Sequence, residues 1–240
     1  MNIAVIFAGG TGQRMNSRSK PKQFLEVHGK PVLIYTLEQF ENHREIDGII
    51  LVCLKSWISY AENLIRKFSI TKVTKIVPGG ESGQESIFHG VEAAKGLYSE
   101  NSIVLIHDGV RPLIDGETIS KCIQQVKESG SAITVSPAIE TIFLKEEHGN
   151  QVGQIFKRSN CEMAKAPQCF RLNDIYQAHL KAIQEGKEDF IDSASLMQNY
   201  GMALFTVEGP AENIKITTPA DFYIFRAILD AKENLQIMGL

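Results

Sequence analysis

Apolar residues follow two alternating patterns along the first part of the chain. Short, mostly apolar runs at 2–7, 47–54 and 102–107 are typical of strands buried on both faces of a sheet. Strands are also predicted at 73–77 and 131–136. Between them, apolar residues recur with helical spacing, which predicts helices at 31–41, 56–68, 84–97 and 116–128, the second of them capped by Ser56. Strands that alternate with helices predict an α/β fold, a Rossmann-like and mostly parallel sheet flanked by helices.

The pattern changes after Ala138. Two β-like runs, 140–144 and 152–156, follow each other with no helix between them, and Gly149 and Asn150 favour a hairpin turn. We therefore expect a β-arm at about 138–158 that projects from the main sheet. The rest of the chain predicts helices at 173–184, 192–200 and 219–232, the last capped by Thr218, and a strand at 203–207. No linker is long enough to divide domains, so residues 1–240 are expected to form one domain.

Composition narrows the class of protein. The 240 residues are 43% hydrophobic and 22% charged, with a net charge of −3, which fits one globular α/β domain. The net charge opposes general nucleic-acid binding, because that needs a broad basic face. No apolar run reaches the length of a membrane span, no secretory signal pattern is present, and the four cysteines lack metal-site spacing. We expect a cytoplasmic protein with no membrane or nucleic-acid partner.

The segment from Ala8 to Phe24 carries the strongest candidate chemistry. After the first strand, the turn of Ala8, Gly9, Gly10, Thr11 and Gly12 lets the backbone approach a ligand closely. Four cations follow with no acid among them: Arg14, Arg18, Lys20 and Lys22. A glycine turn followed by clustered cations predicts a triphosphate site, with a solvated basic loop as the alternative.

Two better-known phosphate motifs do not match. The dinucleotide fingerprint needs a third glycine where Met15 stands, and no GxxxxGK[ST] sequence occurs. No acid follows the second strand, where Val52, Cys53 and Leu54 stand, and this opposes an NAD-dependent oxidoreductase.

Three further segments offer partners for a nucleotide. Asp108 and Arg111 lie in the sequence HDGVRP at the end of a strand, where the acid suits Mg²⁺ or a ribose hydroxyl; a surface ion pair is the alternative. The loop 78–86, which lacks strong charge, suits a nucleobase, although taken alone it is better explained as an ordinary glycine turn before a helix. Lys215 is either a cation for the triphosphate or a charge that protects an edge strand. Loops that follow parallel strands share one edge, so a common rim is expected.

The ordered motifs of the chain resemble one enzyme family. AGGTGQRM, PKQF, VPGG, HDGVRP, PAIETI, PQ-x-F, D-x-A-x-L and NIKITTP are similar to the cytidylyltransferases that include 2-C-methyl-D-erythritol 4-phosphate cytidylyltransferase and ribitol-5-phosphate cytidylyltransferase. The spacing from Arg14 to Lys22 and AGG in place of AAG resemble the ribitol branch.

The resemblance implies roles for individual residues. Arg14, Lys22 and Lys215 would contact the triphosphate and stabilise the transition state. Gly80 and Ser86 would contact cytosine. Asp108 would lie near the ribose and Mg²⁺. The acceptor would be held by Arg111, Thr141 and Arg158, the last two on a β-arm that crosses into the other subunit of a homodimer.

The implied reaction transfers the cytidylyl group of CTP to a polyol phosphate such as ribitol 5-phosphate, giving a CDP-polyol of the kind used as a cell-wall or capsule precursor, and pyrophosphate. No Ser-His-Asp or Cys-His constellation is apparent, and His107 is predicted to be structural. The alternatives are the methylerythritol reaction of isoprenoid synthesis and a non-catalytic sugar-nucleotide-binding protein. Departures from the family pattern gather where the acceptor would lie, at Gly83, Glu162, Lys165, Ala166 and Ile191.

Overall fold

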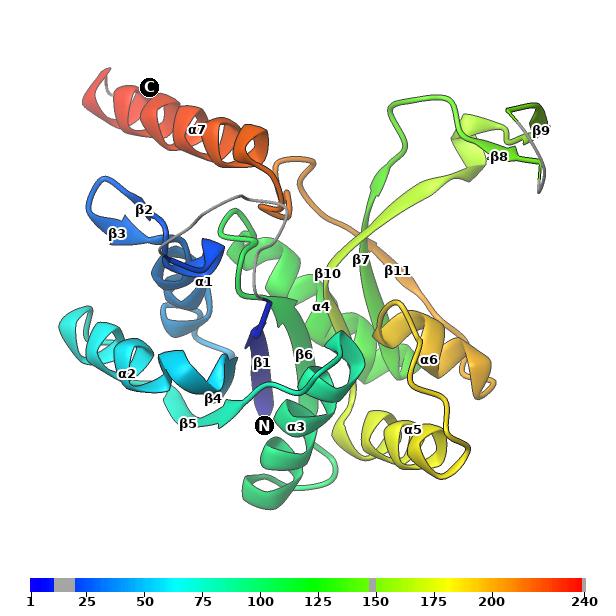
Figure 1. Cartoon of the computed structure of the whole chain (residues 1–240), viewed down its shortest axis with the longest axis horizontal. Helices are drawn as coiled ribbons and strands as arrows, with labels where there is room; N and C mark the ends of the chain where they lie inside the picture. The colour runs from blue at the N-terminus through cyan, green and yellow to red at the C-terminus, as the bar shows by residue number, and fades with distance from the viewer. Residues whose placement is uncertain (11–19, 147–149, 239–240) are drawn as a thin grey trace.

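The fold centres on a seven-stranded sheet in the order β11-β7-β10-β6-β1-β4-β5 (Figure 1). The computed structural model describes residues 1–10, 20–146 and 150–238. β10 runs antiparallel to both of its neighbours, whereas the other paired strands are parallel. The strands are β1 (Asn2–Ala8), β4 (Gly48–Cys53), β5 (Val73–Pro78), β6 (Ile103–Asp108), β7 (Ser131–Pro137), β10 (Glu162–Arg171) and β11 (Thr206–Glu208). The predicted α/β class is confirmed.

Helices cover both faces of the sheet because its central strands are apolar on both. Ala4 and Ile6 of β1 pack with the helices α1 (Val32–Glu41), α2 (Ile58–Lys67) and α4 (Gly116–Ser129). Ile3 and Val5 face the other side, against α3 (Gly83–Leu97), α5 (Leu172–Gln184) and α6 (Ser193–Asn199). Among the described residues, no helix combines the length and the apolar character that crossing a bilayer requires.

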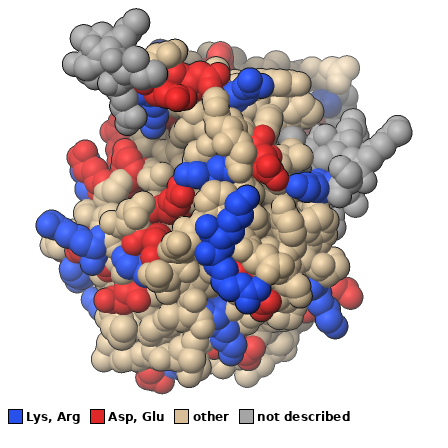
Figure 2. All heavy atoms as spheres, turned by 90° about the vertical axis from the view of Figure 1, so that its left-hand side faces the viewer, with Lys and Arg blue, Asp and Glu red and all other residues tan. Residues whose placement is uncertain are grey.

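The last helix, α7 (Pro219–Met238), begins at Pro219 and is capped by Thr218, as predicted. The Asp221 backbone N–H donates to Thr218 Oγ1 over 3.4 Å, and Asp221 Oδ2 accepts from the Thr218 backbone N–H at 2.7 Å. This reciprocal pair satisfies two donors at the start of the helix. Acidic and basic side chains intermix over the face of the molecule that α7 and α2 help to form (Figure 2).

Two local predictions were wrong. Ser56 does not cap α2, because the short 3-10 turn η3 (Lys55–Trp57) precedes it and the helix begins after Trp57 with no side-chain cap. The long strand β10 was not predicted at all. Its sequence contains Pro167, which disfavours a strand, but the ladder with β7 shifts register between Ala164 and Gln168 and accommodates the proline there.

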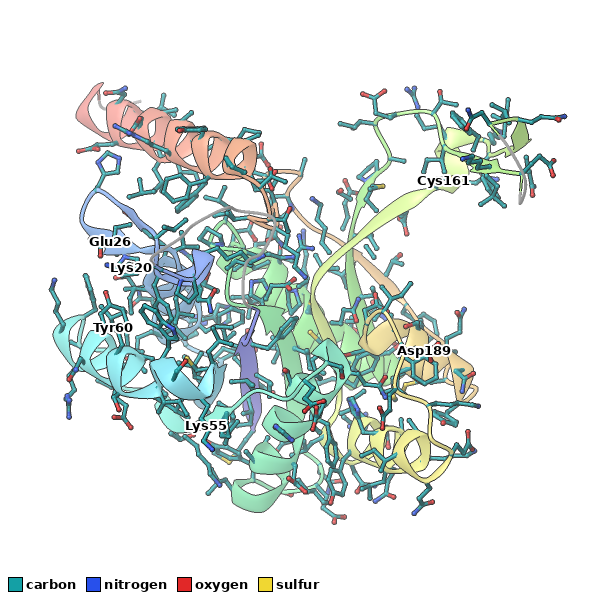
Figure 3. All side chains as sticks on the ribbon, viewed as in Figure 1. Lys20, Glu26, Lys55, Tyr60, Cys161 and Asp189 are labelled. Atoms are coloured by element: carbon teal, nitrogen blue, oxygen red, sulfur yellow. The ribbon has the colours of Figure 1, made fainter. Side chains whose placement is uncertain are left out.

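The predicted β-arm is present. β8 (Phe143–Lys145) and β9 (Val152–Ile155) pair antiparallel and stand away from the sheet, at the end of the extensions of β7 and β10 (Figure 1). Cys161 marks the base of this arm in Figure 3. Gly149, part of the predicted turn, lies outside the described residues. In the single chain, the arm leaves five large apolar side chains exposed to solvent: Ile139, Phe143, Leu144, Val152 and Ile155.

Two buried histidines make the stability of the fold depend on pH. His107 on β6 and His179 on α5 are almost fully excluded from solvent, and burial lowers the pKa of each to about 4. An unfolded histidine titrates near about 6.5, so between about pH 6.5 and pH 4 the unfolded chain binds more protons than the native chain. We expect the free energy of unfolding to fall, as pH falls through this window, by on the order of 3 kcal/mol per histidine.

Urea denaturation at a series of pH values measures this fall. His179→Leu is the matched variant, because among the described residues neither ring nitrogen of His179 has a hydrogen-bond partner. In this variant, the free energy of unfolding should fall only about half as much over the same pH window as in the wild type. An unchanged slope in the variant would contradict the assignment.

Candidate active site

Three glycine-containing loops meet at the carboxyl ends of β1, β5 and β6. A Cβ on Gly79 would lie 3.5 Å from the Cα of Gly9 and 3.1 Å from Ser86 Oγ. A Cβ on Gly109 would lie 2.9 Å from the Cβ of Ala8. The position of Gly109 excludes a Cβ and that of Gly79 is tight, so the three loops lie against one another and confirm the predicted common rim.

Ser86 holds the loop that was predicted to receive a nucleobase. Its hydroxyl accepts from the Gly80 backbone N–H at 3.0 Å and donates to the Ser82 carbonyl at 2.9 Å. Ser82 in turn caps α3 by accepting from the Glu85 N–H at 3.0 Å. Ser86 is therefore engaged within the loop, and it fixes the position of the Gly80 backbone beside the first glycine turn.

Asp108 is the electrostatic centre of the rim. It ends β6, and only 7% of its side chain is exposed. Its Oδ1 lies 2.5 Å from Lys215 Nζ, and its Oδ2 accepts from Arg111 Nε at 2.7 Å. Arg111 also donates from Nη1 to the carbonyl of Asn213 at 2.8 Å. Burial opposes ionisation of the carboxyl, but the two cations outweigh it and hold the pKa of Asp108 below its usual value.

Lys215 comes from the segment before α7, far from Asp108 in sequence. The Ile216 backbone N–H donates to the Val110 carbonyl at 2.9 Å, which binds this segment to the loop after β6. Lys215 Nζ lies 5.8 Å from the centre of the Phe7 ring and 41% of its side chain is exposed. The segment forms no strand, so the reading of Lys215 as an edge-strand charge is wrong.

In the basic run after the first glycine turn, Lys20 and Lys22 lie in different surroundings. Lys22 begins the 3-10 turn η2 (Lys22–Phe24), which is fixed at the end of β1 because Gln23 Nε2 donates to the Ala8 carbonyl at 2.6 Å. Lys20 pairs with Glu26 at 3.0 Å, and both lie near Tyr60 (Figure 3). The remaining predicted residues of this run lie outside the described residues: Thr11, Gly12, Arg14 and Arg18.

Arg111 and Lys215 form a cation cluster around Asp108. A cavity of about 270 Å³ opens between this cation cluster, β10 and α6. Residues that had not been assigned to the site line its far wall: Lys165, Gln168 and Asp192. Gln168 Nε2 donates to Asp192 Oδ2 at 2.8 Å, and Asp192 Oδ1 caps α6 by accepting from the Ser195 N–H at 2.8 Å. The motifs PQ-x-F and D-x-A-x-L contained the last two residues, whereas Lys165 stood out only as a departure from the pattern.

Thr141 and Arg158 are not brought to this cavity within one chain. Both are exposed on the arm, and Arg158 Nη1 donates to the Ile139 carbonyl at 3.3 Å.

His107 lies beneath the rim, where its Nε2 donates to the Arg111 carbonyl at 3.1 Å. With a pKa lowered to about 4 by burial, it is neutral at physiological pH and supports the loop, in agreement with its predicted structural role.

The described residues of the rim do not by themselves form a multidentate magnesium site. Both oxygens of Asp108 are paired with cations, and the described part of the chain contains no group of three or more His, Cys, Asp or Glu residues placed to hold a metal. A divalent ion at this rim therefore depends on oxygens that a bound phosphate supplies.

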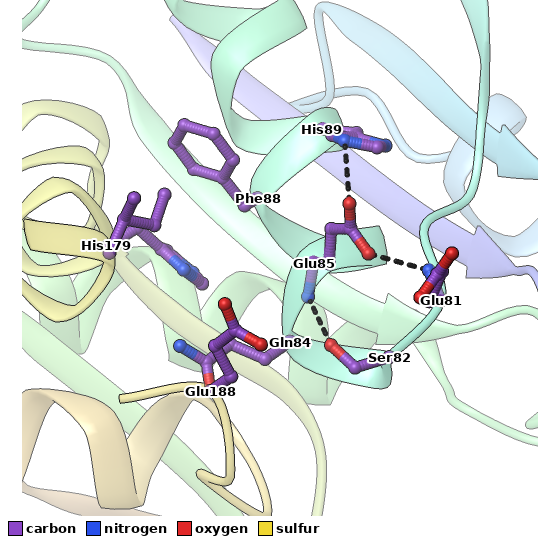
Figure 4. A pocket seen from close by; sticks show the side chains of 9 residues that line it. Glu81, Ser82, Gln84, Glu85, Phe88, His89, His179 and Glu188 are labelled. Atoms are coloured by element: carbon purple, nitrogen blue, oxygen red, sulfur yellow. Dashed lines mark hydrogen bonds and ion pairs between the residues drawn. The ribbon is translucent and has the colours of Figure 1, made fainter. Parts of the chain in front are cut away.

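A second cavity, of about 370 Å³, lies between α3 and α5 (Figure 4). Glu81, Glu85 and Glu188 line it together with His89 and His179, and its lining includes no lysine or arginine. Three carboxylates repel a phosphate, so this cavity does not suit a nucleotide triphosphate. The cationic cavity beside Asp108 is the candidate site.

A parallel α/β sheet with glycine turns and cations at the carboxyl ends of its strands defines a nucleotide-binding enzyme of the nucleotidyltransferase class. The chain belongs to the IspD family, 2-C-methyl-D-erythritol 4-phosphate cytidylyltransferase, which matches residues 2–231. It is 52% identical, over all of both chains, to a protein of Streptococcus agalactiae serotype V named ribitol-5-phosphate cytidylyltransferase.

Two further relatives carry the methylerythritol name. The chain is 38% identical to a 2-C-methyl-D-erythritol 4-phosphate cytidylyltransferase of Clostridium botulinum, across 95% of this chain and 97% of the relative. The crystal structure of 4-diphosphocytidyl-2C-methyl-D-erythritol synthase from Anaerococcus prevotii DSM 20548 superposes with a TM-score of 0.81 at 27% identity, covering 95% of this chain and 96% of that one. The family resemblance drawn from the motifs is confirmed.

The Asp108 cluster predicts a large effect of removing one charge. Asp108→Asn leaves Arg111, whose side chain is only 12% exposed, buried without a counter-ion. We expect the free energy of unfolding in urea to fall by about 3–5 kcal/mol. Asp230→Asn is the control, because its pair with His28 is about half exposed and should contribute less than about 1 kcal/mol. Equal losses in the two variants would show that the burial of Asp108 does not matter.

Proposed function

We propose that this protein transfers the cytidylyl group of CTP to ribitol 5-phosphate or a closely similar polyol phosphate, releasing pyrophosphate. The identity of 52% to a relative named for ribitol 5-phosphate, against 38% to one named for methylerythritol phosphate, favours the polyol over the methylerythritol acceptor. The observation that carries the proposal is the cation cluster of Arg111 and Lys215 around buried Asp108 at the rim of the sheet.

The reaction needs positioning and charge rather than a nucleophilic side chain. A phosphate monoester is largely dianionic at neutral pH because its second pKa is about 6. One of its oxygens attacks the α-phosphorus of CTP, a new P–O bond forms, and the bond to the β-phosphate oxygen breaks as pyrophosphate leaves. No proton has to move, so no general base is required. The barrier lies in bringing two polyanions together and in stabilising the leaving group.

The cations at the rim suit that task. Lys22 and Lys215, with Arg14, would neutralise the triphosphate, and Gly80 and Ser86 would present neutral backbone and hydroxyl groups to cytosine. Asp108 would orient Lys215 and lie beside the ribose, and Arg111 would lie beside the acceptor. Mg²⁺ would arrive bound to the triphosphate, since Asp108 alone does not hold it. The free thiols of the chain fit a reducing compartment, and we place the reaction in the cytoplasm.

We further propose that the enzyme is a homodimer through the β-arm. Ile139 and Ile155 are 78% and 63% exposed on the arm, and burying such residues against a second copy would remove apolar surface from water. Thr141 and Arg158 lie on the same arm, outside the cavity of their own chain. In the dimer they would reach the partner's cavity and contact the acceptor phosphate.

Pyrophosphate release tests the function directly. The purified protein is given CTP and Mg²⁺ with ribitol 5-phosphate, glycerol 3-phosphate or 2-C-methyl-D-erythritol 4-phosphate in turn. We expect the highest kcat/KM with ribitol 5-phosphate. Preference for the methylerythritol substrate would establish the alternative acceptor, and nucleotide binding without turnover would establish a sensor.

The cation assignments predict large rate effects in folded variants. Lys22→Ala and Lys215→Ala should each lower kcat by about a hundredfold or more, because each removes a donor aimed at the leaving pyrophosphate. Lys55→Ala is the control, since Lys55 is exposed beside α2 and outside the cavity (Figure 3). Thermal unfolding checks that each variant is folded. Wild-type turnover in folded Lys22→Ala would refute its role.

Mixing two inactive variants tests the shared site. Arg158→Ala lacks the arm residue and Lys215→Ala lacks the rim residue, so each homodimer should be impaired at both sites. A heterodimer formed by refolding the two together should contain one intact site. We expect about a quarter of the wild-type activity to return if subunits pair at random. No gain above the separate variants would mean that each site is built from one chain.

A further inference from the structure

Lys165 is a partly buried cation without a counter-ion. It lies on β10 at the shift in register with β7, where the chain passes from the arm into the sheet. Its Nζ lies 3.1 Å from the carbonyl of Ala211 and 3.4 Å from that of Asn213, both neutral oxygens. Among the residues that the structure describes, no carboxylate forms an ion pair with it.

The acids that line the cavity, Asp108 and Asp192, are already engaged. Asp108 is shared by Arg111 and Lys215, and Asp192 accepts from Gln168 and from the start of α6. The Lys165 charge is further opposed by its surroundings: burial lowers the pKa of Lys165 most, Arg111 lowers it further, and only exposed Glu212 acts the other way. A cation held in this way gains more from an incoming anion than one that already has a carboxylate partner.

The position of Lys165 indicates which of the two substrate anions, the triphosphate or the acceptor phosphate, it would contact. It lines the cavity on the wall formed by Ala164, Ala166 and Ile191, which belongs to β10 and the loop before α6. The glycine turns that would receive CTP lie at the ends of β1 and β5, on the other side of Asp108. An anion beside Lys165 therefore lies on the opposite side of Asp108 from these glycine turns.

We propose that Lys165 binds the phosphate group of the acceptor, and that this contact, which rests on the proposed function, sets the preference of the enzyme for its acceptor. To do so, the Lys165 ammonium would leave the carbonyls of Ala211 and Asn213 and pair with the dianionic phosphate. Water would then take its place on those carbonyls. Asp192, Ser193 and Gln168 on the same wall offer hydrogen-bonding groups for the hydroxyls of a polyol. Lys165 thereby complements the cations that would hold the triphosphate.

Steady-state kinetics of Lys165→Met and Lys165→Arg test this role. With Met, which keeps the length of the side chain without its charge, we expect the KM for ribitol 5-phosphate to rise about ten- to hundredfold. The KM for CTP should change by less than about twofold, since a uniform loss would indicate distortion of the whole site. Lys165→Arg should restore most of the acceptor affinity. Lys55→Met controls for the loss of one positive charge.

A binding measurement separates this inference from the proposed function. Calorimetric titration with ribitol 5-phosphate should show weaker binding to Lys165→Met than to wild type, whether or not turnover occurs. Unchanged affinity would overturn the role of Lys165 even in an active enzyme. A raised KM for CTP with an unchanged KM for the acceptor would also overturn it and would place Lys165 on the nucleotide. Wild-type protein that binds ribitol 5-phosphate but releases no pyrophosphate would overturn the function alone.

Discussion

The buried carboxylate of Asp108 is the interaction on which the site depends. An ionised carboxylate that is only 7% exposed is costly unless it is paired, and here each oxygen meets a cation. Those cations come from distant parts of the sequence, Arg111 from the loop after β6 and Lys215 from the segment before α7. The pairing therefore fixes the carboxyl-terminal part of the chain against the end of the central strands. It also holds the Lys215 side chain at the mouth of the cavity.

The glycine contacts impose a second constraint, which is steric. The loop that follows Asp108 packs directly on the end of β1, where Gly109 leaves no room for a Cβ. Gly9 and Gly79 lie in van der Waals contact and bring the loops after β1 and β5 together. Of these glycines, the sequence alone indicated Gly9 as a point of close backbone approach to a ligand. In the structure the three glycines allow the close approach of one loop to another, and this is what gathers residues from separate loops at one rim.

Most of the sheet was predictable because its strands are buried on both faces and read as continuous apolar runs. The common rim followed from parallel strand topology, and Asp108 and Lys215 were identified before their contact was seen. β10 escaped prediction because Lys165 and Pro167 interrupt its pattern and its register shifts at that point. The partners of each cation were also inaccessible to pattern reasoning. Nothing in the sequence separates Lys20, which pairs with Glu26, from Lys215, which pairs with Asp108.

The same ion pairs set a limit on what the cations contribute to catalysis. Two unit charges about 4 Å apart interact by about 4 kcal/mol at an effective dielectric constant near 20, so gathering several cations in one small cavity is costly without an acid among them. Asp108 offsets that repulsion, but a carboxylate beside Lys215 also weakens the field that Lys215 exerts on a phosphate. Among the described residues, no carboxylate forms an ion pair with Lys165, and only exposed Glu212 weakens its field. A site that must hold two polyanions side by side is thus served by cations of two kinds. Arg111 and Lys215, which Asp108 balances, keep the fold stable, and Lys165 on β10 would be left for the second anion.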